Sequence, residues 1–450
     1  MWNKKKLAWF LFGLGSQLQL IASLSFTELF VFVATPILFF KEREHMQRNG
    51  IMPFFWLSTT VFCGCIVACI TNHTSFQFAL RGLAVTSLLP CSIVTGHWML
   101  RRDMAGFKWM LLGSAISGIL CTFIFQQAVE VAMLAKGQAG RSAVNAIISG
   151  PTYWIKRLSL VLLSIPKGWY LNTPLWLSAS LPLFIAFFSM LTTESGRSTA
   201  LGALGATALI LFGGKKPSTI KKMVCMRFWL IVSMGIAGIS CAKFVYQISA
   251  EKGWLGEKAH MKYVRQTKGD KSLKALILGG RMESFCGLVA CVDKPIVGFG
   301  PWALDEGGYE EEFLRKYSNP EDYANYLESI RQQLEQWRFR GLRLIPCHAY
   351  ITEFWLWYGI FGLFFWIYVI FILLRYLKQD CWAIPQWYMW LAAAIPSFLW
   401  GIFFSPWSDR VINVLFCVAC LMARAVRQGR CRLPIEMIKE IEDVEEGKLG

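Results

Sequence analysis

The stretch "AYITEFWLWYGIFGLFFWIYVIFILLRYLK", residues 349–378, decides the fold class of this chain. Residues 349–374 carry only one charged side chain, Glu353, and the run ends in the basic residues Arg375 and Lys378. An α-helix rises about 1.5 Å per residue, so a run of this length crosses the roughly 30 Å of bilayer hydrocarbon. The stretch predicts a membrane-spanning helix whose basic end faces the cytoplasm.

The rest of the chain repeats this pattern. Its 450 residues are 55% hydrophobic and only 17% charged, below the roughly one quarter that is usual in soluble proteins. Alternating strand patterns are absent, and backbone groups in lipid must be bonded within their own segment. We therefore predict an all-α polytopic membrane protein with about 12 spans, near 7–23, 27–40, 52–71, 79–100, 106–125, 147–166, 174–193, 198–213, 227–247, 349–374, 386–403 and 411–427.

The net charge of +17 arises from 46 Lys and Arg against 29 Asp and Glu. In a soluble protein this charge would indicate a nucleic-acid partner, but here the basic clusters flank apolar runs, as cytoplasmic loops do. No nucleic-acid partner is expected, and the first helix is read as retained. The clusters are Lys4–Lys6, Lys41–Arg48, Arg101–Arg102, Lys215–Arg227, Arg375–Lys378 and Arg424–Arg432.

Placing these clusters on the cytoplasmic side of the membrane divides the chain into four regions. Residues 1–247 hold spans 1 to 9, and residues 248–348 form one large loop on the outer face. Residues 349–427 hold the last three spans, and 428–450 form a cytoplasmic tail. In the loop, residues 319–340 start with helix-start signals and repeat apolar residues at helical spacing, which predicts an amphipathic helix over the membrane. Most of the 14 cysteines lie in apolar runs, so no disulfide framework is expected.

Three cationic positions are expected on the outer face, against the charge bias of the rest of the chain. A planar guanidinium is suited to phosphate oxygens, and a neutral imidazole can accept a proton. The alternative is that each residue only anchors a helix at the membrane surface. The three are Arg197 in a short turn, Arg281 in the large loop, and His348 at the outer end of span 349–374. Arg141 falls on the same side, as a further phosphate contact or an ordinary loop cation.

Two pairs of glycines follow these residues. Gly298 and Gly300 close the segment "PIVGFG", 295–300, after Arg281, and they permit a tight backbone approach to a neighbour or a ligand. Gly359 and Gly362 follow His348 in the expected span.

The order Arg197, Arg281 before "PIVGFG", and His348 before Gly359-Ile-Phe-Gly362 resembles the O-antigen ligase superfamily of bacterial polytopic glycosyltransferases. That group includes O-antigen ligases, O-antigen polymerases and protein O-oligosaccharyltransferases. The resemblance covers residues from about 130 to 427. The ligase pattern has a small polar residue after the histidine, where this chain has Ala349. This departure leaves the subclass open within the superfamily.

The resemblance implies transfer of a glycan from undecaprenyl diphosphate to an acceptor hydroxyl at the periplasmic face of the bacterial inner membrane. Arg281 and Arg197 would stabilise the departing diphosphate, and His348 would act as the base, with inversion at the sugar carbon. No Asp-x-Asp motif occurs in the outer segments and no P-loop or dinucleotide fingerprint is found, so neither a metal nor a cofactor is expected.

The residues leave several functions open. A ligase that acts on a lipid core is the first expectation, and an O-antigen polymerase or a protein-directed transferase needs the same groups. A transporter or flippase of the lipid-linked glycan is the alternative from another class. A transporter would show internal pseudo-symmetry and cations along a central cavity, whereas the suspected cations here gather at one face.

Overall fold

The structure, a computed structural model, describes residues 4–16, 19–21, 24–117, 285–317, 344–347, 349–381, 383–404 and 410–432, with isolated positions between 120 and 252. Within these residues the regular secondary structure is helical, apart from one short antiparallel ribbon of β1 (Gln19–Ile21) and β2 (Leu24–Ser25) and an isolated bridge between Leu304 and Leu344. This agrees with the helical class expected from the sequence. The amphipathic helix predicted at 319–340 and the tail 433–450 lie outside the described residues.

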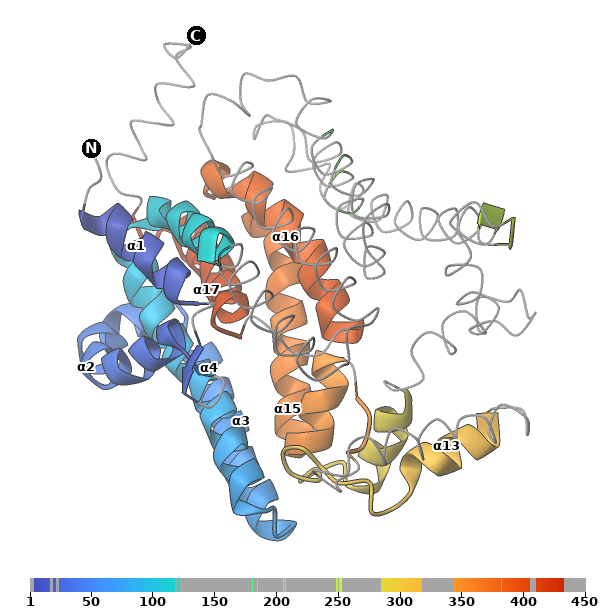
Figure 1. The fold of residues 1–450 in the computed structure, drawn as a ribbon. Helices are drawn as coiled ribbons and strands as arrows, with labels where there is room; N and C mark the ends of the chain where they lie inside the picture. Colours follow the sequence, from blue (N-terminus) through green and yellow to red (C-terminus); the bar gives the residue numbers. More distant parts are fainter. Residues whose placement is uncertain are drawn as a thin grey trace, which may run out of the picture.

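Most of the helices lie where apolar runs predicted them (Figure 1). The helical segments are α1 (Lys4–Gly15), α2 (Phe26–Arg48), α3 (Met52–Thr71), α4 (Phe76–Arg102), the 3-10 turn η1 (Met104–Gly106), residues 107–117, residues 285–293, α13 (Tyr309–Tyr317), α15 (Tyr350–Arg375), the π-helical turn η2 (Tyr376–Asp380), α16 (Pro385–Phe404) and α17 (Arg410–Arg427).

Helix α4 packs against α2, α3 and α17, and α15 packs against α3 and α16. Large apolar side chains fill the space between these helices. Phe54 of α3 stacks on Phe365 of α15 with ring centroids 5.6 Å apart, and both rings are buried. One continuous apolar core therefore joins the N-terminal helices to the C-terminal ones, although most of the sequence lies between them.

Local sequence signals explain the bounds of α2 and the start of α3. The Ser25 side chain accepts from the Glu28 backbone N–H, and the Glu28 side chain accepts from Ser25 N–H, which forms a capping box. Gly50, with a φ of 70°, follows the other end of α2, and a proline lies in the first turn of α3. The turn between the two helices is therefore short and fixed.

The first expected span, 7–23, is not one continuous helix. Helix α1 ends at Gly15, and the ribbon follows. Both the backbone N–H and the hydroxyl of Ser16 donate to the Gly13 carbonyl, at 3.1 and 2.7 Å, and so close the helix end. At 12 residues, α1 is about 18 Å long, too short to cross the hydrocarbon alone.

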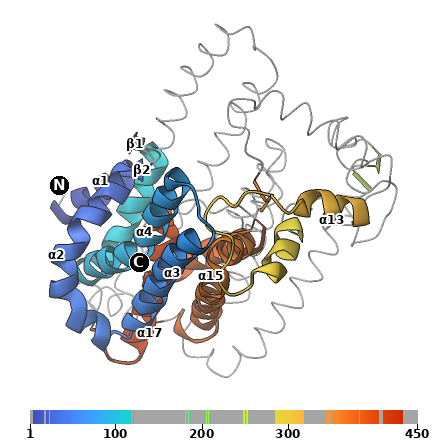
Figure 2. The ribbon, with the colours of Figure 1, turned by 90° about the horizontal axis from the view of Figure 1, so that it is seen from below.

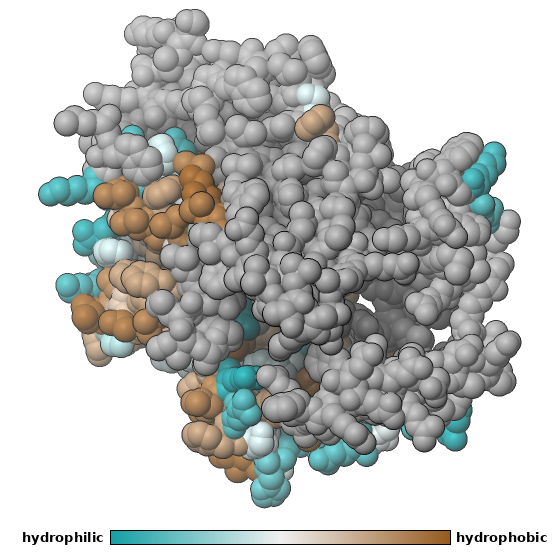
Figure 3. Space-filling model, in the orientation of Figure 1, coloured by the Kyte–Doolittle hydropathy of each residue, from teal (hydrophilic) through white to brown (hydrophobic). Residues whose placement is uncertain are grey.

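Among the residues that the structure describes, three helical segments are long and apolar enough to cross a membrane: α3, α4 and Ile360–Asp380. Together with the apolar composition, they indicate a membrane protein. Figure 3 shows apolar surface over α1, α2 and α3. On α2, the side chains of Val33, Ile37 and Phe40 are 67%, 62% and 81% exposed, at a spacing that places them on one face of the helix.

Helix α15 is not the single straight span expected over 349–374. Gly359 has φ 62° and ψ −147°, and the helix breaks there. The rings of Tyr350 and Trp366 lie 5.1 Å apart, whereas 16 residues of a continuous helix would extend about 24 Å. Residues 350–358 therefore fold back along the start of the second half, and the candidate spanning segment begins only at Ile360.

The two ends of the described bundle differ in their contents. At one end lie the basic end of α4, the turn between α2 and α3, and the end of α17. Arg101 of α4 bonds to Glu42 near the end of α2, and a Cβ on Gly50 in the turn would lie 3.3 Å from Arg430, just after α17. The turn between α3 and α4, the segment 285–317 and the break in α15 lie at the opposite end, at the bottom of Figure 1. The described part of the expected outer loop is thus remote from the basic clusters of α4 and α17.

Candidate functional site

The four polar residues expected to carry chemistry, His348, Arg281, Arg197 and Arg141, lie outside the described residues. The four glycines expected to shape the site are described, and they lie at the break in α15. We call this region the α15 break site. It consists of residues 294–300, the two sides of Gly359, and the end of α3.

A backbone seam joins the segment 296–300 to the broken helix. The N–H groups of Phe299 and Gly300 donate to the carbonyls of Leu356 and Trp357, at 2.7 and 3.1 Å. On the other side of the break, the N–H of Ile360 donates to the Ile296 carbonyl at 3.1 Å. A helix break frees carbonyls and N–H groups that would be costly to leave unbonded. Here the segment 296–300 supplies their partners.

This seam requires glycine on both sides. A Cβ on Gly298 would lie 2.6 Å from the Gly359 nitrogen, and a Cβ on Gly359 would overlap the Ile296 carbonyl oxygen. Gly298 and Gly359 also have positive φ angles of 78° and 62°, which side chains disfavour. Gly298 thus makes the kind of tight approach that glycine permits, and its neighbour is the backbone at Gly359.

Gly300 and Gly362 also allow close packing at this site. The Gly300 φ is 85°, and a Cβ there would lie 2.5 Å from the hydroxyl of Thr74 in the α3–α4 turn. A Cβ on Gly362 would overlap the Phe354 carbonyl oxygen, because the first half of α15 folds back over it.

Asn72, just after α3, holds the segment 294–300 in place. Its amide nitrogen donates to the carbonyls of Ala68 and Gly298, at 2.8 and 3.0 Å. Its amide oxygen accepts from the Lys294 ammonium at 2.7 Å, and that ammonium also lies 4.8 Å from the centre of the Phe299 ring. One amide side chain thus bonds to the helix, the loop and an exposed cation.

The sequence neighbours of His348 are described. Ala349 is the extended N-cap residue of α15, and Cys347 packs against Gly287 of helix 285–293. Burial, and secondly the charge of Glu353, raise the pKa of the Cys347 thiol, and burial raises the pKa of the Cys291 thiol to about 12. Neither thiol is a ready nucleophile at neutral pH.

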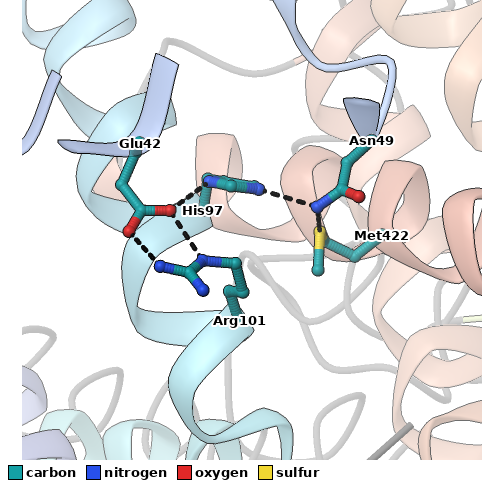
Figure 4. Close-up of polar contacts among 5 residues, drawn as sticks. All are labelled: Glu42, Asn49, His97, Arg101 and Met422. Atoms are coloured by element: carbon teal, nitrogen blue, oxygen red, sulfur yellow. Dashed lines mark hydrogen bonds and ion pairs between the residues drawn. The ribbon is translucent and has the colours of Figure 1, made fainter. Parts of the chain in front are cut away.

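A buried polar cluster at the opposite end of the bundle was not expected from the sequence (Figure 4). Arg101 of α4 donates from Nε to Glu42 Oε2 at 2.8 Å and from Nη2 to Glu42 Oε1 at 2.5 Å. His97 Nδ1 lies 3.1 Å from Glu42 Oε2, at ion-pair distance. The Asn49 amide nitrogen lies 3.0 Å from His97 Nε2 and 3.7 Å from the Met422 sulfur. Since an amide nitrogen only donates, His97 Nε2 accepts, and its proton resides on Nδ1.

Burial alone would raise the pKa of the Glu42 carboxyl, but its contacts with His97 and Arg101 outweigh burial and lower that pKa to about 2. Glu42 and Arg101 belong to two different basic clusters, 59 positions apart in the sequence, and Glu42 lies within the last two turns of α2, which continues to Arg48. The only sequence signal for this cluster was an acidic residue, Glu42, just after the expected span 27–40.

Two other buried carboxylates have partners in the structure. Glu28 caps α2 and lies 3.9 Å from Arg410. Asp380 lies 2.5 Å from Arg427 and 3.7 Å from Arg375. Within the described ranges, no three His, Cys, Asp or Glu side chains gather closely enough to hold a metal ion.

Comparisons with protein-family models, with curated proteins and with solved structures found no match to this chain.

Proposed function

We propose that this chain is a multi-pass membrane glycosyltransferase with about twelve spans in the bacterial inner membrane. It moves a glycan from undecaprenyl diphosphate to an acceptor hydroxyl at the periplasmic face. The ligase reaction on a lipid core is the form we propose first. The resemblance of the sequence around Arg197, Arg281 and His348 motivates this proposal.

The observation that carries the proposal is the backbone seam at the α15 break site. The segment that follows Arg281 in the chain is bonded, through residues 296–300, to the helix that follows His348. A transferase of this kind needs its diphosphate-binding arginine and its base at one face of the membrane. A fixed junction between the two stretches of chain supports that arrangement.

In the proposed reaction the acceptor oxygen forms a bond to the anomeric carbon while the bond to the diphosphate breaks. His348 takes the acceptor proton, and the diphosphate leaves with the electron pair of the broken bond. Arg281 and Arg197 stabilise the charge that develops on the diphosphate, and Arg141 adds a further contact. A base positioned in this way contributes about 10²–10⁴ in rate.

The exposed face of α2 supports contact of this helix with lipid in the proposed membrane protein. Its stripe of exposed apolar side chains continues from Phe26 to Phe40, about 21 Å along the helix. Charged residues lie only at the ends of this stripe, at Glu28 and from Lys41 onwards. Such a surface is unfavourable in water and is typical of contact with lipid.

One observation favours a transporter instead, because broken helices often form the substrate sites of transporters. In those sites the freed helix ends face the substrate near the membrane midplane. Here the N–H of Ile360 and the carbonyls of Leu356 and Trp357 are bonded to the outer segment. The break also lies where the candidate span begins. We therefore keep the transferase as the proposal and the transporter as the alternative.

The test uses the full chain in nanodiscs with a polyprenyl-diphosphate-linked glycan and a panel of acceptors. We expect product on a lipid-core acceptor, a loss of about 10²–10⁴ in rate for His348→Ala, and a comparable loss for Arg281→Ala. Matched controls are His73→Asn, at a left-handed position after α3, and Arg315→Ala on α13 of the same loop.

The other outcomes separate the alternatives. Lengthening of the glycan without a core acceptor would identify a polymerase, and transfer to a protein would identify a protein-directed enzyme. Movement of the lipid-linked glycan across a bilayer, with no bond formed to any acceptor, would replace the transferase by a transporter.

A further inference from the structure

Helix 285–293 has two unlike faces. Cys286, Ala290 and Cys291 are buried in the junction with α15, beside which the helix lies in Figure 2. The opposite face of the helix is apolar and exposed: Leu288 and Val289 are each 41% exposed, and Val292 is 67% exposed. Ile296, three residues after the end of the helix, is 64% exposed. Successive residues of a helix are rotated by about 100°, so Leu288, Val289 and Val292 fall within one arc of about 100° around the helix axis. We call these four residues the outer apolar stripe.

The stripe is continuous with the start of a candidate membrane span. The Ile296 carbonyl accepts from the N–H of Ile360 at 3.1 Å, and Ile360 is the first residue of the spanning segment Ile360–Asp380. The stripe therefore lies at the depth where that helix enters the hydrocarbon. On the neighbouring hairpin, Ile70 and Phe76 are 70% and 81% exposed, so apolar surface reaches this level on α3 and α4 as well.

Aromatic side chains with polar edges lie at the same level. The Trp355 indole N–H donates to the Pro295 carbonyl at 3.1 Å. Trp302 stacks on Trp357 with ring centroids 4.9 Å apart. Trp is enriched at membrane–water interfaces, where one side of the ring is apolar and the other is wet. This group fits the boundary between hydrocarbon and headgroups.

Lys294 supplies the matching charge. It is exposed, and its ammonium is held between the Asn72 amide oxygen and the Phe299 ring. The bond to Asn72 uses one of three N–H donors of the ammonium. A cation fixed beside an apolar stripe, at the mouth of a span, is complementary to a lipid phosphate above acyl chains.

We propose that residues 285–296, which comprise helix 285–293 and the start of the turn after it, lie at the membrane interface, with the outer apolar stripe seated among the acyl chains of the outer leaflet and Lys294 contacting phospholipid phosphates. The occupant of this surface is bulk phospholipid of the bilayer. The inference is independent of glycan transfer, because it concerns the seating of the segment and no reaction.

The test replaces Val292, and separately Ile296, by the photocrosslinking residue p-benzoylphenylalanine in the full chain. The control site is Glu312, an exposed position on α13 of the same loop. All three positions tolerate a large side chain, because none is buried. The proteins are placed in nanodiscs of phosphatidylethanolamine and phosphatidylglycerol, irradiated, and weighed by intact mass spectrometry.

We expect phospholipid adducts from positions 292 and 296 at about ten times the yield from position 312, a ratio that corresponds to preferential burial in hydrocarbon. In the Val292 crosslinking variant, Lys294→Gln should reduce the share of phosphatidylglycerol among the adducts severalfold. Neither result needs a glycan donor, so both test the membrane-interface proposal independently of the proposed reaction.

Three results would overturn the inference. Adducts to this chain or to a second copy would show that protein covers the stripe. Equal lipid yields from positions 292 and 312 would show that the stripe is not seated deeper than α13. Adducts that form only after undecaprenyl diphosphate is added would assign the surface to the lipid carrier rather than to bulk phospholipid.

Discussion

The backbone of Gly298 lies so close to that of Gly359 that a Cβ on Gly298 would be 2.6 Å from the Gly359 nitrogen. The two residues are 61 positions apart in the sequence. Their contact joins the described end of the large loop to the break in α15, and the hydrogen bonds on both sides of it satisfy the helix ends that the break exposes. Changes at this contact should therefore affect the loop and the helix together.

Gly359→Ala should lower the free energy of unfolding by about 3 kcal/mol, because it combines strain at a glycine-only backbone angle with overlap at the Ile296 carbonyl. Gly308→Ala is the matched control. Its φ is 67°, but no atom lies within 4 Å of the added Cβ, so about 1–2 kcal/mol is expected. Thermal unfolding of both variants in detergent measures the difference. Equal shifts would mean that the close contact contributes nothing.

Asn72→Ala should loosen the segment 294–300, because it removes the partners of the Gly298 carbonyl and of the Lys294 ammonium. We expect a loss of about 1–3 kcal/mol and faster hydrogen exchange at the amides of Phe299 and Gly300. The control is Thr71→Ala, since the Thr71 hydroxyl bonds only within its own helix, to Val67. Unchanged exchange in the Asn72 variant would show that the seam holds without the clamp.

Tyr350→Ala should destabilise the fold-back of α15 by about 3–5 kcal/mol. The Tyr350 ring packs against Trp366 and Phe398, and its hydroxyl end lies against Gly401 of α16. Phe371→Ala, on the exposed face of the same helix, should cost far less. Thermal unfolding in detergent compares the two. A Tyr350 variant as stable as the Phe371 variant would contradict the fold-back packing.

Glu42→Gln should cost about 3 kcal/mol at neutral pH, because it leaves the Arg101 guanidinium without its carboxylate. The folded pKa of Glu42, about 2, lies below the ordinary value of 4.5. The carboxylate therefore contributes stability above about pH 4.5, and this contribution is lost as the pH falls from 4.5 towards 2.

The measurement is unfolding temperature against pH for wild type, Glu42→Gln and the exposed control Glu44→Gln. Wild type and the control should lose stability together between pH 4.5 and 2, and the Glu42 variant should lose less. Parallel curves for all three proteins would show that protonation of Glu42 does not contribute to the loss of stability in acid.

Much of the helical layout could be predicted from the sequence. The run 52–71 coincides with α3, and the runs 79–100, 386–403 and 411–427 lie within α4, α16 and α17. These runs are continuous, apolar and bounded by charges or turns, so the local pattern alone settles them. The predictions failed for 7–23 and 349–374, where hydropathy stays high through a helix end that is set by Ser16 in one case and by Gly359 in the other.

The site shows the same division. Composition and spacing pointed to tight backbone contact at Gly298 and Gly300, because glycine is the residue that permits it. They could not name Gly359 as the partner of Gly298, Asn72 as the clamp, or Arg410 as the partner of Glu28, since each contact joins residues far apart in the chain.

The sequence by itself therefore determined that this protein is helical and apolar enough for a membrane, with basic clusters between its apolar runs. Hydrophobic run length and charge position are local quantities, and they are sufficient for that much. Only the tertiary structure decided where α15 breaks and which buried charges meet. A break at Gly359 is stable because the distant segment 296–300 bonds to the exposed helix ends, and Glu42 is stable in the interior because Arg101 and His97 face it.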